Sequence, residues 1–118
     1  MKNLLLAITL CIGFFSNAQK MSMSFLEGTW VPQSLCSELT FSGTSSSSFR
    51  IEMIAPNEER TPLKILGYQF DKNNFYLESV YERNDFQCIG KFTILDKNTI
   101  SVDYVSDAPA TVIYKRKQ

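Results

Sequence analysis

Few side chains of this sequence are suited to covalent or acid–base chemistry. The chain contains no histidine, so the usual general base and the usual partner of a serine or cysteine nucleophile are missing. Glu58 and Glu59 form a carboxylate pair, but adjacent acidic residues in a polar loop are typically solvated. The serine run 45–48 reads as a flexible turn, because no base can be named to activate it. We therefore predict that the protein is not an enzyme and uses no cofactor.

Thiol chemistry rests on Cys36 and Cys88, because the third cysteine, Cys11, lies in a segment expected to be removed. The two could form a disulfide, remain free thiols or bind a metal. Without histidine or a Cys-x-x-Cys spacing the usual zinc sites are missing, and no metal is expected. In an exported protein a pair of cysteines favours the disulfide. It would close a loop of 88 − 36 = 52 positions, which contributes about 4 kcal/mol in the chain-entropy treatment.

Residues 1–18 have the pattern of a secretory signal peptide. Lys2 gives a basic start, an apolar run covers residues 4–15, and Ala18 is the small residue before the expected cleavage site. The apolar run is shorter than the about 20 residues that a membrane span needs. A lipid anchor at Cys11 is disfavoured, because the preceding residue is not small and the cysteine lies inside the apolar run. We expect export to the periplasm or the extracellular space, with no integral membrane segment after cleavage.

Residues 19–118 are expected to form a single domain, since about 100 residues build one hydrophobic core. Removal of Lys2 lowers the 12 basic residues of the chain to 11, against 12 acidic residues, which gives a net charge of −1. The only basic cluster is residues 115–117, and a basic face or stripe is missing. No nucleic-acid partner is therefore expected.

Short alternating runs separated by turn residues predict an all-β domain, and no segment shows sustained helical periodicity. About eight short strands at this spacing are typical of a sandwich or an antiparallel up-and-down barrel. The predicted strands are residues 28–33, 38–41, 49–54, 63–70, 75–81, 86–95, 99–105 and 110–116. The residues expected to face inward are Leu39, Phe41, Phe49, Ile51, Met53, Phe75, Leu77, Phe92, Ile100, Val102, Tyr104 and Val112.

The first predicted strand opens with Gly28, Thr29 and Trp30, and the last one ends with the basic residue Arg116. A Gly-x-Trp start in an eight-strand meander resembles the lipocalins and their small bacterial relatives. The resemblance implies a lipocalin-like barrel in which Trp30 plugs the closed end and Arg116 packs over it. Avidin-like barrels also begin with Gly-Thr-Trp, and a plain core position for Trp30 remains open as well.

The resemblance further implies a small apolar ligand near the open end of the barrel. An eight-strand interior is either filled by side chains or holds one small ligand, and both alternatives have apolar linings. The alternation of strand directions places Cys36 and Cys88 at the open end, where a bridge would draw the Cys36 loop across the mouth. The candidate ligand-binding residues are Phe49, Ile51, Met53, Phe75, Leu77, Phe92 and Tyr104.

The function expected from these observations is the binding of a small apolar ligand by an exported barrel, without catalysis. An alternative is a periplasmic inhibitor or immunity-type protein that binds a partner enzyme through its loops. The charged loop 55–62, bounded by Pro56 and Pro62, motivates that alternative. A third possibility is a structural envelope protein with no discrete site.

Overall fold

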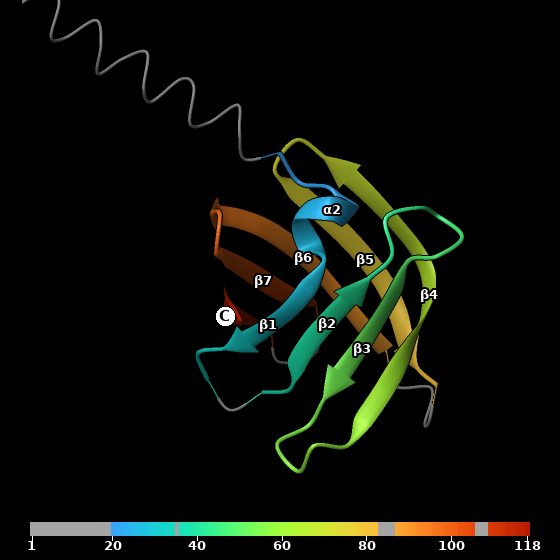
Figure 1. Ribbon diagram of the computed structural model, residues 1–118, viewed down its shortest axis with the longest axis vertical. Coiled ribbons are helices and arrows are strands. Elements are labelled where there is room, and N and C mark those ends of the chain that lie inside the picture. The colour runs from blue at the N-terminus through green and yellow to red at the C-terminus, as the bar shows by residue number, and fades with distance from the viewer. Residues whose placement is uncertain (1–19, 35, 83–86, 106–108) are drawn as a thin grey trace, which may run out of the picture.

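Eight antiparallel strands close into one barrel in the computed structural model, which describes residues 20–34, 36–82, 87–105 and 109–118 (Figure 1). Each strand pairs with the next one along the chain, and β1 pairs with β8 to complete the circle. The predicted all-β class and antiparallel up-and-down barrel are thereby confirmed. The strands are β1 (Gly28–Pro32), β2 (Glu38–Ser42), β3 (Arg50–Ile54), β4 (Arg60–Asp71), β5 (Asn74–Tyr81), β6 (Gln87–Asp96), β7 (Thr99–Val105) and β8 (Ala110–Arg116).

Strand ends follow the predicted turns closely except at β4. This strand begins at Arg60, inside the predicted loop 55–62, so the loop is shorter than expected. Pro62 does not bound the loop but stands within β4, opposite Glu52, where the β3–β4 ladder ends. A proline suits the end of a ladder, because it has no N–H with which to extend the pairing.

Some sequence predictions fall on parts of the chain that the structure does not describe. The expected leader, residues 1–18, lies outside the described residues. The same holds for Phe86, the expected start of the sixth strand, and for most of the expected turns 82–85 and 106–109.

A short helix, α2 (Met23–Leu26), covers the closed end of the barrel (Figure 1). The side-chain oxygen of Ser22 caps it by accepting a hydrogen bond from the Phe25 N–H at 3.1 Å, and Leu26 is fully buried. The chain then enters β1 through Gly28, whose φ of 120° favours glycine. The helix was not predicted, because four residues are too few to show a helical period.

Trp30 lies fully buried beneath this helix, and its Nε1 donates a hydrogen bond to the Leu26 carbonyl at 2.8 Å. The guanidinium of Arg116 lies 4.3 Å from the centre of the Trp30 ring and 5.1 Å from that of Phe25. It also donates to the carbonyls of Phe25, at 2.8 Å, and Glu27, at 3.1 Å. This is the arrangement of Trp30 and Arg116 that the lipocalin resemblance implies.

Aromatic rings fill the barrel next to the closed end. The Phe75 ring is fully buried, and its centre lies 5.3 Å from that of Phe92 and 5.9 Å from that of Phe49. Tilted and edge-on aromatic pairs of this kind stabilise a core beyond the area that they bury. All the residues predicted to face inward are buried except Met53 and Tyr104, which are half-buried. Free space is therefore expected only towards the opposite end, where Met53 and Tyr104 lie.

The serine run 45–48 forms a structured turn between β2 and β3. The hydroxyls of Ser45 and Ser48 are hydrogen-bonded at 2.7 Å, and the Phe49 N–H donates to the Ser45 carbonyl at 2.9 Å. Gly43 opens the turn with a φ of 86°, and a Cβ there would collide with the Ser48 carbonyl. The hydroxyls of Ser45 and Ser48 therefore form hydrogen bonds within the turn.

Candidate functional site

A cavity of about 290 Å³, which we call the mouth cavity, lies at the end of the barrel opposite α2. Its walls come from the ends of β3, β5 and β7 and the beginning of β6, because odd strands end where even strands begin. Of the lining residues that the structure describes, none is a lysine, arginine, aspartate or glutamate. They are Cys36, Ser37, Met53, Tyr81, Gln87, Cys88, Ile89, Tyr104, Val105 and Tyr114.

A smaller cavity of about 100 Å³ adjoins the mouth cavity and shares Ser37, Met53 and Tyr81 with it. Met53, from β3, and Tyr81, from the end of β5, line both cavities. An unbranched thioether adapts its shape easily. The usable space therefore depends on the rotamer of Met53.

Two of the seven candidate ligand-binding residues, Met53 and Tyr104, line the mouth cavity. The remaining five are buried in the aromatic core and are not among its lining residues: Phe49, Ile51, Phe75, Leu77 and Phe92. Large rings from several strands meet near the barrel axis, so the interior is packed there. A ligand in the mouth cavity would rest on this packed layer.

Two phenol groups meet at the inner wall of the mouth cavity. The hydroxyls of Tyr104 and Tyr114 lie 2.5 Å apart, a short hydrogen bond in which either group can donate. Tyr114 is 1% exposed. Burial is the main cause that raises the pKa of both phenols above the usual value, and their mutual proximity raises that of Tyr104 further. Both groups therefore keep their protons and act as neutral hydrogen-bonding groups.

Sequence reasoning did not select Tyr114, although a signal for it was present. Val112 and Tyr114 are two positions apart on β8 and both are buried, so they share the inward face. Tyr81 was missed because it closes its strand next to a predicted turn. The alternation that selected Tyr104 would have selected Tyr114 as well.

Cys36 and Cys88 are both free thiols in the structure, and both line the mouth cavity. Cys36 is exposed on the β1–β2 connection, and Cys88 is 7% exposed on β6. Burial raises the pKa of the Cys88 thiol, so it stays protonated to a higher pH. The pKa of Tyr81 is raised by burial and then by negative charge on either thiol. The two cysteines therefore lie near one phenol, and their pairing stays a prediction.

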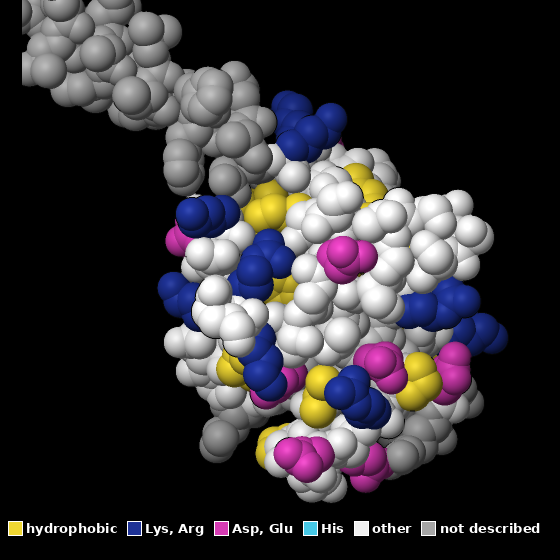
Figure 2. All heavy atoms as spheres, in the orientation of Figure 1, with side chains coloured by type: hydrophobic (Ala, Val, Ile, Leu, Met, Phe, Trp, Pro, Cys, Tyr) yellow, Lys and Arg dark blue, Asp and Glu magenta, His cyan; other side chains and the backbone are white. Residues whose placement is uncertain are grey.

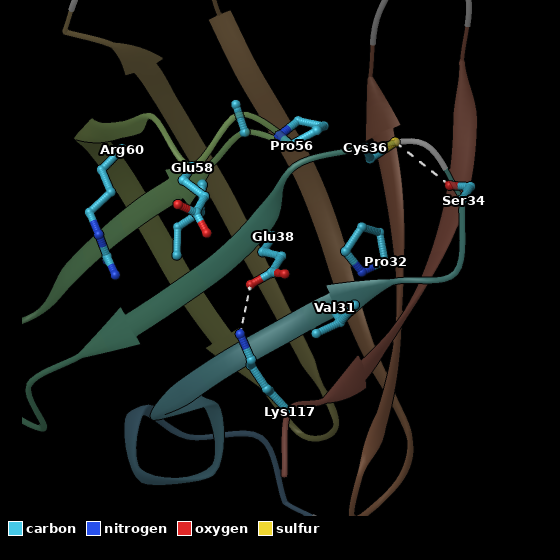
Figure 3. Close-up of a pocket in the computed structure, with 11 residues that line it drawn as sticks. Val31, Pro32, Ser34, Cys36, Glu38, Pro56, Glu58, Arg60 and Lys117 are labelled. Carbon is cyan, nitrogen blue, oxygen red and sulfur yellow. Dashed lines mark hydrogen bonds and ion pairs between the residues drawn. The ribbon is translucent and has the colours of Figure 1, made fainter.

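A second hollow of about 630 Å³ lies beside the turn of the β3–β4 hairpin, and we call it the hairpin groove (Figure 3). Glu58 and Arg60 border it from the hairpin, and the Lys117 ammonium pairs with the Glu38 carboxylate there at 3.7 Å. Glu58 has a φ of 67° and is exposed. Cys36 borders both hollows.

The charges around the hairpin groove belong to a surface of mixed sign. Arg60 forms a second ion pair, with Glu52 at 3.7 Å, and both side chains are well exposed. The face drawn in Figure 2 shows basic and acidic side chains interspersed over the barrel. Exposed pairs of this kind stabilise a protein little. The groove is therefore lined by both acidic and basic side chains, and neither charge predominates among the described residues.

Within residues 20–34, 36–82, 87–105 and 109–118, no three histidine, cysteine or acidic side chains converge as metal ligands. No helix in the same part of the chain has the length and apolar character required to cross a membrane. Comparisons of the chain with family models, curated proteins and solved structures gave no match.

Proposed function

We propose that this protein is an exported, lipocalin-like binding protein that takes up a small apolar molecule in the mouth cavity and performs no chemistry on it. The observation that carries the proposal is the mouth cavity itself, a hollow at one end of a closed barrel whose described lining residues are uncharged side chains. Apolar walls with a few polar groups are typical of small-molecule sites. The Trp30–Arg116 contact at the other end supports the lipocalin-like reading.

The size of the cavity limits the ligand. A volume of about 290 Å³ lies just below the about 300–1,000 Å³ typical of ligand pockets. The packed rings of Phe75 and Phe92 block the way towards the closed end. The ligand we propose is therefore a compact molecule held near the rim, not a long chain that threads the barrel.

Export and the disulfide belong to the same proposal. The leader predicted for residues 1–18 would deliver the chain to an oxidising compartment, where thiol pairs form disulfides. Cys36 and Cys88 line one cavity, which supports their pairing. A bridge would tie the β1–β2 connection to β6 at the rim. The mass of the protein purified from the exported fraction, with and without reductant, tests this pairing.

Binding is tested by titrating residues 19–118 with the neutral fluorescent probe N-phenylnaphthylamine. Met53→Lys puts a charge at the cavity wall, whereas Ile54→Lys changes the next residue on β3, which borders the hairpin groove. We expect saturable binding that falls by at least about tenfold in Met53→Lys, because an unpaired ammonium is costly in apolar surroundings. Ile54→Lys should leave binding unchanged. Lack of saturable binding to the unmodified protein would overturn the proposal.

A second candidate function is the capture of a protein partner through the loops, and the hairpin groove favours it. The groove is larger than the mouth cavity and carries charges of both signs, as polar protein interfaces do. A pull-down with the tagged mature chain tests it, followed by alanine substitution of residues 57–60. Loss of a specific partner together with unchanged probe binding would support this function over the first.

A further inference from the structure

The Tyr104–Tyr114 pair has one more hydroxyl proton than the hydrogen bond between the two phenols requires. Two phenol hydroxyls carry two protons, and a single hydrogen bond at 2.5 Å joins their oxygens. One of the two protons lies in that bond, whichever phenol donates it. Among the described residues neither hydroxyl has another hydrogen-bonding partner. The pair therefore offers one O–H donor at the wall of the mouth cavity.

A buried donor constrains what enters the cavity. Tyr114 is 1% exposed and lines the mouth cavity. Water that bonds to its hydroxyl must therefore occupy that cavity. A molecule that fills the cavity displaces this water and leaves the donor unsatisfied unless it brings an acceptor of its own. An acceptor oxygen on the ligand restores the lost hydrogen bond.

The charge of the ligand is constrained as well. Among the residues that the structure describes, the lining of the cavity includes no lysine or arginine and no aspartate or glutamate. A carboxylate at the inner wall would lose hydration without gaining a cation, and an ammonium would find no anion. The polar side chains Ser37 and Gln87 do not supply either charge.

We propose that the ligand is an uncharged apolar molecule with one hydrogen-bond acceptor oxygen, such as a ketone, ester or ether, which accepts the spare proton of the Tyr104–Tyr114 pair. This inference rests on the proposed function, because it names the ligand class of the same cavity. It assigns to the two phenols the recognition of a polar atom, and to Met53, which packs against the core from β3, the apolar contact.

The test compares three probes of nearly equal shape by calorimetry at neutral pH: acetylnaphthalene, ethylnaphthalene and naphthoate, substituted at the same ring position. The ketone should bind about five- to tenfold more tightly than the hydrocarbon, the factor that one hydrogen bond supplies. Naphthoate should bind more weakly than the ketone. The double variant Tyr104→Phe/Tyr114→Phe should bind ketone and hydrocarbon alike, with hydrocarbon affinity unchanged.

Both tyrosines are replaced because either one alone still has a proton to donate. Tyr76→Phe is the matched control, since this ring lies on the outer side of β5 and is 39% exposed, and it should leave all affinities unchanged. A second measurement needs no variant: the infrared carbonyl band of the bound ketone should lie lower than in an alkane solvent.

The possible outcomes separate the two proposals. If no probe binds to the unmodified protein, the proposed function fails. If ketone and hydrocarbon bind equally well, or the ketone keeps its advantage in the double variant, the recognition by the phenols is overturned while ligand binding stands. An unshifted carbonyl band in the bound ketone overturns it likewise.

Discussion

Replacing Arg116 by alanine is expected to destabilise the barrel by about 3 kcal/mol. Its guanidinium donates to the carbonyls of Phe25, Glu27 and Lys97 at 2.8, 3.1 and 3.2 Å, and each such bond contributes about 0.5–1.5 kcal/mol net. The position over the Trp30 ring adds about 0.5–2 kcal/mol. Because Arg116 is only partly buried, the lower halves of these ranges apply. Their sum is a large share of a typical stability of about 5–15 kcal/mol.

The assay is urea unfolding followed by tryptophan emission. Trp30 is the single tryptophan of the chain and is fully buried, so its emission reports directly on the closed end. Lys115→Ala is the matched control, because the side chain of this neighbour makes a single hydrogen bond to the described residues, from its Nζ to the Thr99 hydroxyl at 3.2 Å. The melting temperature of Arg116→Ala should fall by about 15 °C.

Arg116→Lys should fall between the native protein and Arg116→Ala, because an ammonium keeps the charge but not the planar fork of donors. The reasoning would be refuted if Arg116→Ala lost less than about 1 kcal/mol, or no more than Lys115→Ala. Such a result would mean that the helix α2 and the barrel hold together without the guanidinium.

Three further outcomes follow from the structure. Phe75→Ala, which empties a fully buried ring position, should cost about 3–5 kcal/mol in thermal unfolding, and a cost below about 1 kcal/mol would contradict a packed core. Gly43→Ala should cost about 2 kcal/mol, because φ is 86° and the Cβ meets the Ser48 carbonyl; Gly67→Ala, with nothing within 4 Å, should be close to neutral. In the reduced protein at pH 8, iodoacetamide should modify exposed Cys36 about tenfold faster than Cys88, whose pKa is raised by burial; equal rates by mass spectrometry would contradict the burial.

The strands could be predicted because their alternation is local. β5 and β7 begin after turns whose residues are recognisable from the sequence alone, such as Asp71–Asn74. The helix α2 is a different case, because it is stabilised by the Ser22 cap and by packing on the barrel. Neither of these produces a periodic pattern of apolar residues in the sequence. The early start of β4 is also set by pairing with β3 and not by its own composition.

The site was predictable only in part. The alternation identified Met53 and Tyr104 as inward, and the strand directions placed Cys36 and Cys88 at the same end of the barrel. Which inward side chains reach the mouth depends on strand tilt and stagger, which residue types do not determine. For this reason Phe49 was proposed for the ligand although it packs in the core.

The pairing of β1 with β8 joins the first and last strands of the chain, whereas each other pairing joins strands that are neighbours in sequence. Arg116 is bonded to carbonyls 89 and 91 positions earlier in the chain, so the ring is sealed by contacts between its most distant strands. Such contacts form slowly, because a long loop must be ordered first. Until β8 arrives, β1 and β7 present open edges to any neighbouring chain. Because β8 pairs with both of them, the docking of this one strand removes both open edges together.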